Sequence, residues 1–90
     1  HVVLVARKIS ALEEVDDAIK AFGGNVTLVP LDLKEFDKID ELPKHLAVRF
    51  GKLDILVGNA AILGDLRPLT DFTPKMWQEV LAVNLTANWR

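Results

Sequence analysis

Polar side chains that could bind a nucleotide stand directly after three apolar runs of the sequence. Arg7 and Lys8 follow the run Val2–Ala6, Asp32 lies between two leucines at the end of a second run, and Gly58–Ala61 follows a third. Ligands of parallel α/β sheets bind at the carboxyl ends of the strands. If the three runs are such strands, these residues are the first candidates for a binding site.

Arg7 stands where a dinucleotide-binding fold places the nucleotide ribose. An acidic residue there binds the ribose hydroxyls of NAD, whereas an Arg suits the 2′-phosphate of NADP. After Arg7, no carboxylate occurs before Glu13. A solvated basic pair formed by Arg7 and Lys8 is the alternative interpretation.

The other two strand ends offer a carboxylate and a loop of small residues. Asp32 could accept a hydrogen bond from an adenine amino group, or it could cap the helix that follows. In Gly58-Asn59-Ala60-Ala61 the small side chains let a ligand approach the backbone, and Asn59 can donate and accept to hold the turn. An ordinary tight turn after a strand would explain the same residues.

Asn84 is the most informative single residue, because asparagine has a poor helix propensity. It lies four residues after Val80 and seven after Trp77, which places it on the apolar face of the last predicted helix. A buried amide there needs partners, such as a water, a backbone carbonyl or a catalytic side chain. A polar group satisfied at a helix-packing contact is the alternative, and Asn88 lies one turn further along the same face.

Strands and helices alternate among the elements that must position these residues. Strands are expected at residues 2–6, 26–33 and 53–57, and helices from Ser10, over about 37–50, and from Pro74 onward. This alternation predicts parallel strands joined by right-handed crossovers. Pro30 cannot donate to a ladder, so the second strand should lie at a sheet edge or be broken there.

Local signals mark the ends of the predicted helices. Ser10 and Glu13 have the spacing of a capping box, and Gly23-Gly24 should stop that helix. The second helix either begins at Asp40 or is kinked at Pro43, and Gly51 ends it. Thr73-Pro74 has the residue types of an N-cap followed by the first helical position.

Composition narrows the class of protein. The chain has 90 residues, a formal net charge of −2 and no cysteine, which excludes disulfides, thiolate metal clusters and a cysteine nucleophile. The small charge argues against binding to nucleic acid or an anionic membrane. No apolar run approaches the ~20 residues of a membrane span, and no metal-ligand cluster has the usual spacing. A cytoplasmic α/β protein is expected, either oligomeric or part of a larger core, because 50% of its residues are apolar.

In order along the chain, these motifs resemble those of the short-chain dehydrogenase/reductase family. The resemblance rests on four segments and covers the whole chain: Val2–Arg7, Leu31-Asp32-Leu33, Leu53–Ala61 and Trp77–Leu85. It implies an α/β fold with a Rossmann-like doubly wound parallel sheet. The 90 residues would form an interior part of this single domain, with about three strands and three helices.

The resemblance also implies roles for individual residues. Asn59 matches the second Asn of the family's Asn-Asn-Ala-Gly signature; Gly58 replaces its first Asn and Ala61 its Gly. The loop Asn59, Ala60 and Ala61 would border the cofactor, Asp32 and Leu33 would contact adenine, and Arg7 would favour NADP. Asn84 would be the helix Asn of the catalytic tetrad, which holds a water in the proton relay.

The function implied is hydride transfer between a nicotinamide, NADP rather than NAD, and a carbonyl or alcohol substrate. The family's Gly-rich turn would precede His1 and its catalytic Ser, Tyr and Lys would follow Arg90, so these residues alone should be inactive. A non-catalytic nucleotide-binding α/β module and an NAD-preferring dehydrogenase are the alternatives. A homo-oligomer, tetramer or dimer, is expected by analogy.

Overall fold

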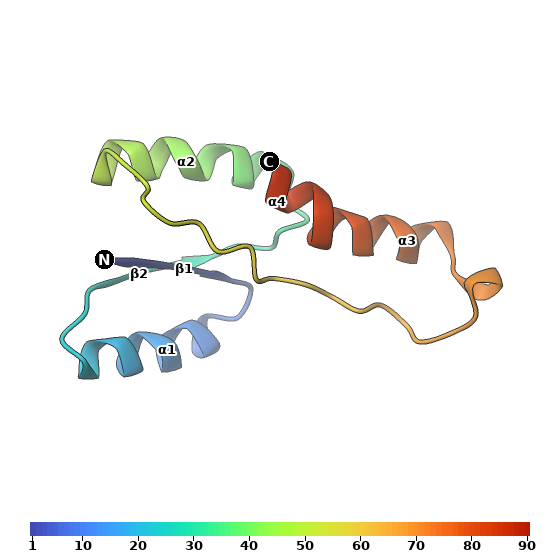
Figure 1. Cartoon of the computed structure of the whole chain (residues 1–90), viewed down its shortest axis with the longest axis horizontal. Helices are drawn as coiled ribbons and strands as arrows, with labels where there is room; N and C mark the ends of the chain where they lie inside the picture. The colour runs from blue at the N-terminus through green and yellow to red at the C-terminus, as the bar shows by residue number, and fades with distance from the viewer. The chain divides into compact units, whose positions relative to one another are not determined.

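The structure is a computed structural model that describes all 90 residues, His1–Arg90 (Figure 1). The chain divides into two compact units, His1–Asp32 and Leu33–Arg90. None of its helices combines the length and the apolar character that crossing a membrane would require.

The first unit is a strand, a helix and a second strand. Strands β1 (Val2–Ala6) and β2 (Val26–Pro30) pair in parallel, in register from Val2↔Val26 to Ala6↔Pro30. Helix α1 (Ile9–Ala21) connects them and packs on both strands, burying Leu12. The predicted parallel strand–helix–strand unit is therefore confirmed.

Helix α1 ends where predicted, but its N-terminal cap differs from the prediction. The capping box at Ser10 is wrong: the helix begins at Ile9, Lys8 is the N-cap, and no side chain caps it. Because the helix begins three residues before Leu12, the N–H of Leu12 already donates to the carbonyl of the N-cap residue, Lys8. The stop at Gly23 is confirmed: this glycine has a φ of 80°, and its N–H donates to the Lys20 carbonyl.

Strand β2 ends at Pro30, so the predicted break is confirmed and the predicted extension to Leu33 is wrong. Pro30 lies opposite Ala6, the last residue of β1, and the pairing ends at these two residues. The N–H of Leu31 donates the last bond to the Ala6 carbonyl, at 2.9 Å. Asp32 and Leu33 therefore follow the strand rather than belonging to it.

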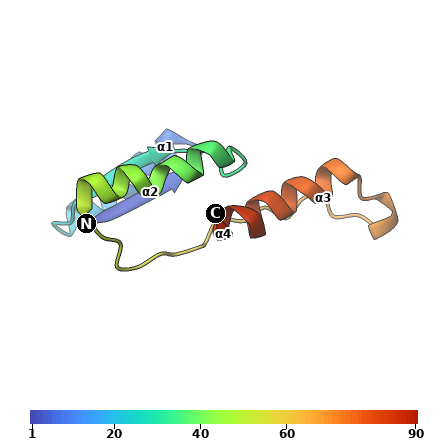
Figure 2. The same ribbon diagram turned by 90° about the horizontal axis from the view of Figure 1, so that it is seen from above.

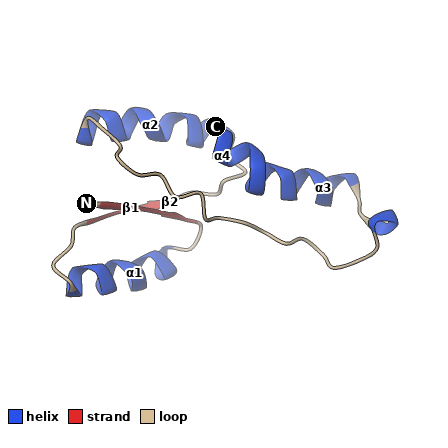
Figure 3. Ribbon diagram, in the orientation of Figure 1, coloured by secondary structure: helices blue, strands red, loops and turns tan.

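The second unit begins with helix α2 (Phe36–Phe50), which starts one residue before the predicted range of about 37–50 and ends where predicted. Pro43 lies inside this helix, and the early start excludes the alternative that the helix begins at Asp40. Gly51, with a φ of 75°, ends it as predicted. Residues 52–68 then form a long segment without helix or strand (Figure 3).

The third predicted strand, residues 53–57, is not formed, and this prediction is wrong. Strands are stabilised by pairing, and the only sheet of the structure is the β1–β2 pair. The apolar side chains of the segment are exposed, among them Ile55 at 79% and Val57 at 76%. The Rossmann-like sheet of this chain therefore has two parallel strands instead of three.

The chain ends in a helical run of three parts, visible as one rod in Figure 2: α3 (Pro74–Leu81), a π-helical turn (Ala82–Thr86) and α4 (Ala87–Trp89). A 3-10 turn (Leu69–Asp71) precedes it. The predicted cap is confirmed, because the Thr73 hydroxyl accepts from the Met76 N–H at 3.2 Å.

An ion pair joins the two helical parts of the second unit. The guanidinium of Arg90 donates to both carboxylate oxygens of Asp40 and lies 5.0 Å from the centre of the Phe36 ring. The hydrogen bond from Arg90 is the main reason that the pKa of Asp40 lies below its ordinary value. This pair fixes the end of α4 to α2.

Candidate cofactor and catalytic site

The side chain of Asn84 makes two hydrogen bonds to the backbone of one loop residue. Its Oδ1 accepts from the Ile62 N–H and its Nδ2 donates to the Ile62 carbonyl, both at 2.8 Å. The amide thus pairs with Ile62 as a neighbouring strand would. These bonds hold the loop that follows residues 58–61 against the last helical run, 22 residues later in sequence.

Asn84 lies in the middle of the π-helical turn. The N–H of Ala87 donates to the carbonyl of Ala82, five residues earlier, so the backbone is wider here than in an α-helix. Such single turns occur frequently at functional sites. The only feature of the sequence that pointed to this turn is an asparagine within a helix of apolar periodicity.

Asn84 was expected to be buried and to have a polar partner, and only the second expectation is met. Its side chain is exposed, so the expected burial on an apolar face is wrong, in keeping with Trp77, which is 53% exposed. The expected polar partner exists and is a backbone group. Asn84 is thus an exposed residue whose side-chain amide is anchored by Ile62.

A second asparagine contacts Asn84 from the next turn. The Nδ2 of Asn88 donates to the backbone carbonyl of Asn84 at 3.0 Å. Asn84 is therefore hydrogen-bonded at two places: its side chain to the backbone of Ile62, and its backbone carbonyl to the side chain of Asn88.

The loop Asn59, Ala60 and Ala61 is exposed and has no regular secondary structure. Its small side chains leave the backbone accessible, as the sequence predicted for a loop that a ligand approaches. Ile62, the next residue, is the one that Asn84 anchors. The structure thus brings the predicted loop and the predicted helix residue together within the second unit.

The remaining predicted residues lie at the carboxyl ends of the two strands. Arg7 directly follows β1, is exposed and takes part in none of the ion pairs of the chain. Asp32 and Leu33 follow β2 and are half-buried. Because Ala6 and Pro30 are paired in register, Arg7 and Asp32 follow their strands at the same edge of the sheet.

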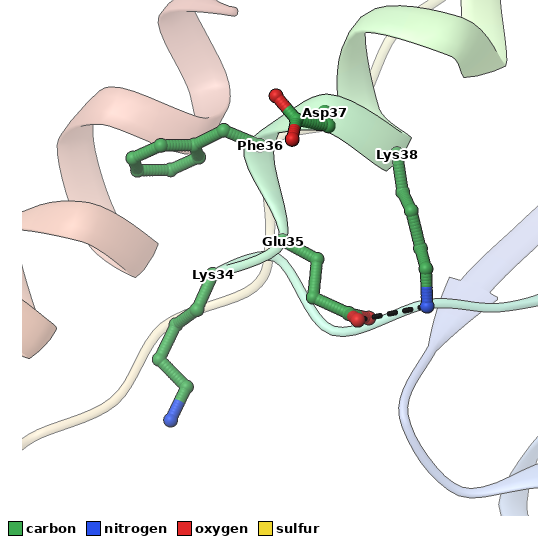
Figure 4. Close-up of a pocket in the computed structure, with 5 residues that line it drawn as sticks. All are labelled: Lys34, Glu35, Phe36, Asp37 and Lys38. Atoms are coloured by element: carbon green, nitrogen blue, oxygen red, sulfur yellow. Dashed lines mark ion pairs between the residues drawn. The ribbon is translucent and has the colours of Figure 1, made fainter.

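An open hollow of about 420 Å³ lies at the start of α2, immediately after Leu33 (Figure 4). A single stretch of chain lines it, residues 34–38. Its lysines are engaged: Lys38 pairs with Glu35 at 2.7 Å, and Lys34 lies 4.0 Å from Glu79. None of the predicted site residues lines this hollow.

Groups with clearly shifted pKa values lie outside the candidate site. The pKa of Lys20 is raised, chiefly by its hydrogen bond to Asp16, and that of Lys44 by its bond to Glu41. Both are exposed pairs within one helix, which contribute little to stability. No three His, Cys, Asp or Glu side chains lie together as metal ligands would.

The family profile described as short chain dehydrogenase matches residues 1–89. The chain belongs to the short-chain dehydrogenase/reductase family. It is 38% identical over 87 residues to a short chain dehydrogenase/reductase of Colletotrichum higginsianum, which covers 97% of this chain and 32% of that protein. It is 37% identical over 79 residues to an uncharacterized NAD-dependent oxidoreductase of Mycobacterium tuberculosis, covering 88% of this chain and 28% of that protein.

The fold is that of a solved member of the same family. A metagenomic short-chain oxidoreductase in complex with NADP superposes with a TM-score of 0.94 at 34% identity, covering 99% of this chain and 40% of that one. The two strands and the helices therefore form part of a Rossmann-like α/β fold. The chain spans about a third of the length of the curated relatives it matches.

Proposed function

We propose that these 90 residues are an interior part of the single NADP-binding domain of a short-chain oxidoreductase. The enzyme transfers hydride between the nicotinamide and a carbonyl or alcohol carbon. The observation that carries the proposal is the pair of bonds from Asn84 to Ile62, which joins the proposed catalytic residue to the proposed cofactor loop.

The residues at the strand ends suit the cofactor chemically. Arg7 is an exposed guanidinium that is not engaged by any carboxylate of the chain, so it can bind the 2′-phosphate of NADP. Asp32 and Leu33 would contact the adenine, and the backbone of Asn59, Ala60 and Ala61 would border the ribose. The relatives do not decide the preference, since one is NAD-dependent and another is in complex with NADP.

When bound, the nicotinamide would supply the hydride chemistry. The residues of this chain would bind the cofactor and orient the water of the proton relay. Asn84 would hold a water of the proton relay at a position set by its bonds to Ile62. The family's general acid is a tyrosine, and the chain contains none, so we expect the isolated 90 residues to be inactive. The Gly-rich turn and the catalytic Ser, Tyr and Lys would come from segments outside these residues.

The proposal includes a homo-oligomer, a tetramer or dimer, in the cytoplasm. Apolar side chains recur every four residues along the last helical run and are exposed: Trp77 at 53%, Leu81 at 37%, Leu85 at 63% and Trp89 at 81%. We call these four residues the apolar stripe. An exposed stripe of this kind fits a subunit contact.

The test compares Arg7→Ala with Lys8→Ala in the full-length protein, by fluorescence titration with NADPH and with NADH. Loss of one charge-assisted phosphate contact predicts that Arg7→Ala weakens NADPH binding about tenfold and NADH binding less than about twofold. Lys8→Ala is the matched control, because it removes the neighbouring cation. Equal weakening of both cofactors by Arg7→Ala would refute the role of Arg7, and binding without turnover of any carbonyl would favour the non-catalytic module.

A further inference from the structure

A Cβ added at Gly58 would meet the side chain of another residue, which would have to shift. A Cβ on Gly58 would lie 2.7 Å from Oδ1 of Asn88 and 3.3 Å from its Cγ. The backbone does not itself demand glycine here, because Gly58 is not among the glycines with positive φ. The small residue is therefore explained by Asn88, which lies 30 positions later in the sequence.

The same Asn88 amide also contacts the π-helical turn. Its Nδ2 donates to the backbone carbonyl of Asn84 at 3.0 Å, while its Oδ1 faces Gly58. Asn84 in turn binds Ile62 through its side chain. One asparagine amide thus binds the loop at Ile62, and a second lies against it at Gly58.

We propose that Asn88 is a positioning residue that acts through Asn84, and that Gly58 and Asn88 form a matched pair. Asn88 holds the Asn84 carbonyl and, by filling the space over Gly58, sets the distance between the loop and the π-helical turn. This inference rests on the proposed function, since what Asn88 positions is the residue assigned to the proton relay. It also explains why the loop has Gly58 where the family signature has an Asn.

The test is a double-mutant cycle in the full-length protein: Asn88→Ala, Gly58→Ala and the double variant, with Asn25→Ala as the exposed control. Asn88→Ala should lower kcat about tenfold and leave the KM and Kd of the cofactor within about twofold, because the role proposed for Asn88 is to position Asn84 and not to bind the cofactor. Gly58→Ala should have a similar effect, since the new Cβ displaces the Asn88 amide. The double variant should match Asn88→Ala within about twofold, because the Cβ then meets no amide.

The outcomes separate this inference from the proposed function. If the two single effects on kcat multiply in the double variant, or if Asn88→Ala leaves kcat unchanged in an active enzyme, the positioning role is overturned. If the wild-type protein neither binds nor oxidises a reduced nicotinamide, the proposed function fails instead. In that case thermal unfolding tests whether Gly58 and Asn88 are a matched pair. A Tm of the double variant no lower than that of Gly58→Ala supports the pair, and additive losses of Tm overturn it.

Discussion

Replacing Asn84 should loosen the loop more than the loss of one exposed side chain would. Asn84→Ala removes two hydrogen bonds of 2.8 Å to the backbone of Ile62. A typical hydrogen bond contributes about 0.5–1.5 kcal/mol. Asn84 is exposed, so water replaces part of what is lost, and we expect a loss of about 1–2 kcal/mol in the free energy of unfolding. In a full-length enzyme this corresponds to a fall in Tm of about 2–8 °C.

A second variant separates the hydrogen bonds from the volume of the side chain. Asn84→Asp keeps the acceptor for the Ile62 N–H but places an oxygen opposite the Ile62 carbonyl, where the wild type has the Nδ2 donor. We therefore expect Asn84→Asp to be at least as destabilised as Asn84→Ala at neutral pH. The assay is thermal unfolding by circular dichroism, with Asn25→Ala as the control. If Asn84→Asp melts like the wild type, the paired geometry does not hold the loop.

Three further predictions concern other parts of the molecule. Asp40→Asn should destabilise the protein at neutral pH. Because the hydrogen bond from Arg90 lowers the pKa of Asp40 below 3.8, this contribution is fully present above that value and is lost as the pH falls through the lowered pKa; a difference between variant and wild type that persists in strong acid would contradict it. Gly51→Ala should lower the free energy of unfolding, measured by urea denaturation, by about 1–2 kcal/mol. The reason is that a φ of 75° strains alanine, although the space around Gly51 is open. An unchanged urea midpoint would argue against the left-handed cap. Leu85→Arg in the apolar stripe should shift the mass measured by light scattering toward the monomer; an unchanged oligomer would place the contact elsewhere.

The elements that the sequence predicted well are those with local causes. Gly23 and Gly51 end α1 and α2 because each adopts a positive φ that other residues avoid, and Thr73 caps α3 with its own hydroxyl. Strand β2 ends at Pro30, as the residue type indicated. Each of these signals acts over a few residues, and the type of residue alone indicates the outcome.

The features that escaped prediction depend on partners distant in the sequence. Residues 53–57 are apolar enough for a strand, but a strand needs a neighbour to pair with, and β1 and β2 pair only with each other. The π-helical turn at Asn84 has no local signature beyond an asparagine in a helix, and its anchor, Ile62, is 22 residues away. The fit of Asn88 over Gly58 is likewise visible only once the loop and the helix are folded.

In the candidate site, too, some residues could be predicted from local signals and others could not. Arg7 and Asp32 were predicted because they follow the carboxyl ends of two strands. The register of Ala6 with Pro30 places both at one edge of the sheet. The family resemblance, rather than periodicity, singled out Asn84 for a catalytic role. What that residue contacts, a loop backbone on one side and a second asparagine on the other, required the structure.

The oxidation of NADPH by the full-length protein, followed by the absorbance of the reduced nicotinamide with a panel of aldehydes and ketones, tests the central claim most directly. We expect carbonyl-dependent oxidation of NADPH, slower oxidation of NADH, and a loss of most of the rate in Asn84→Ala with cofactor binding retained. Binding of neither cofactor, or an Asn84→Ala rate equal to that of the wild type, would contradict the account.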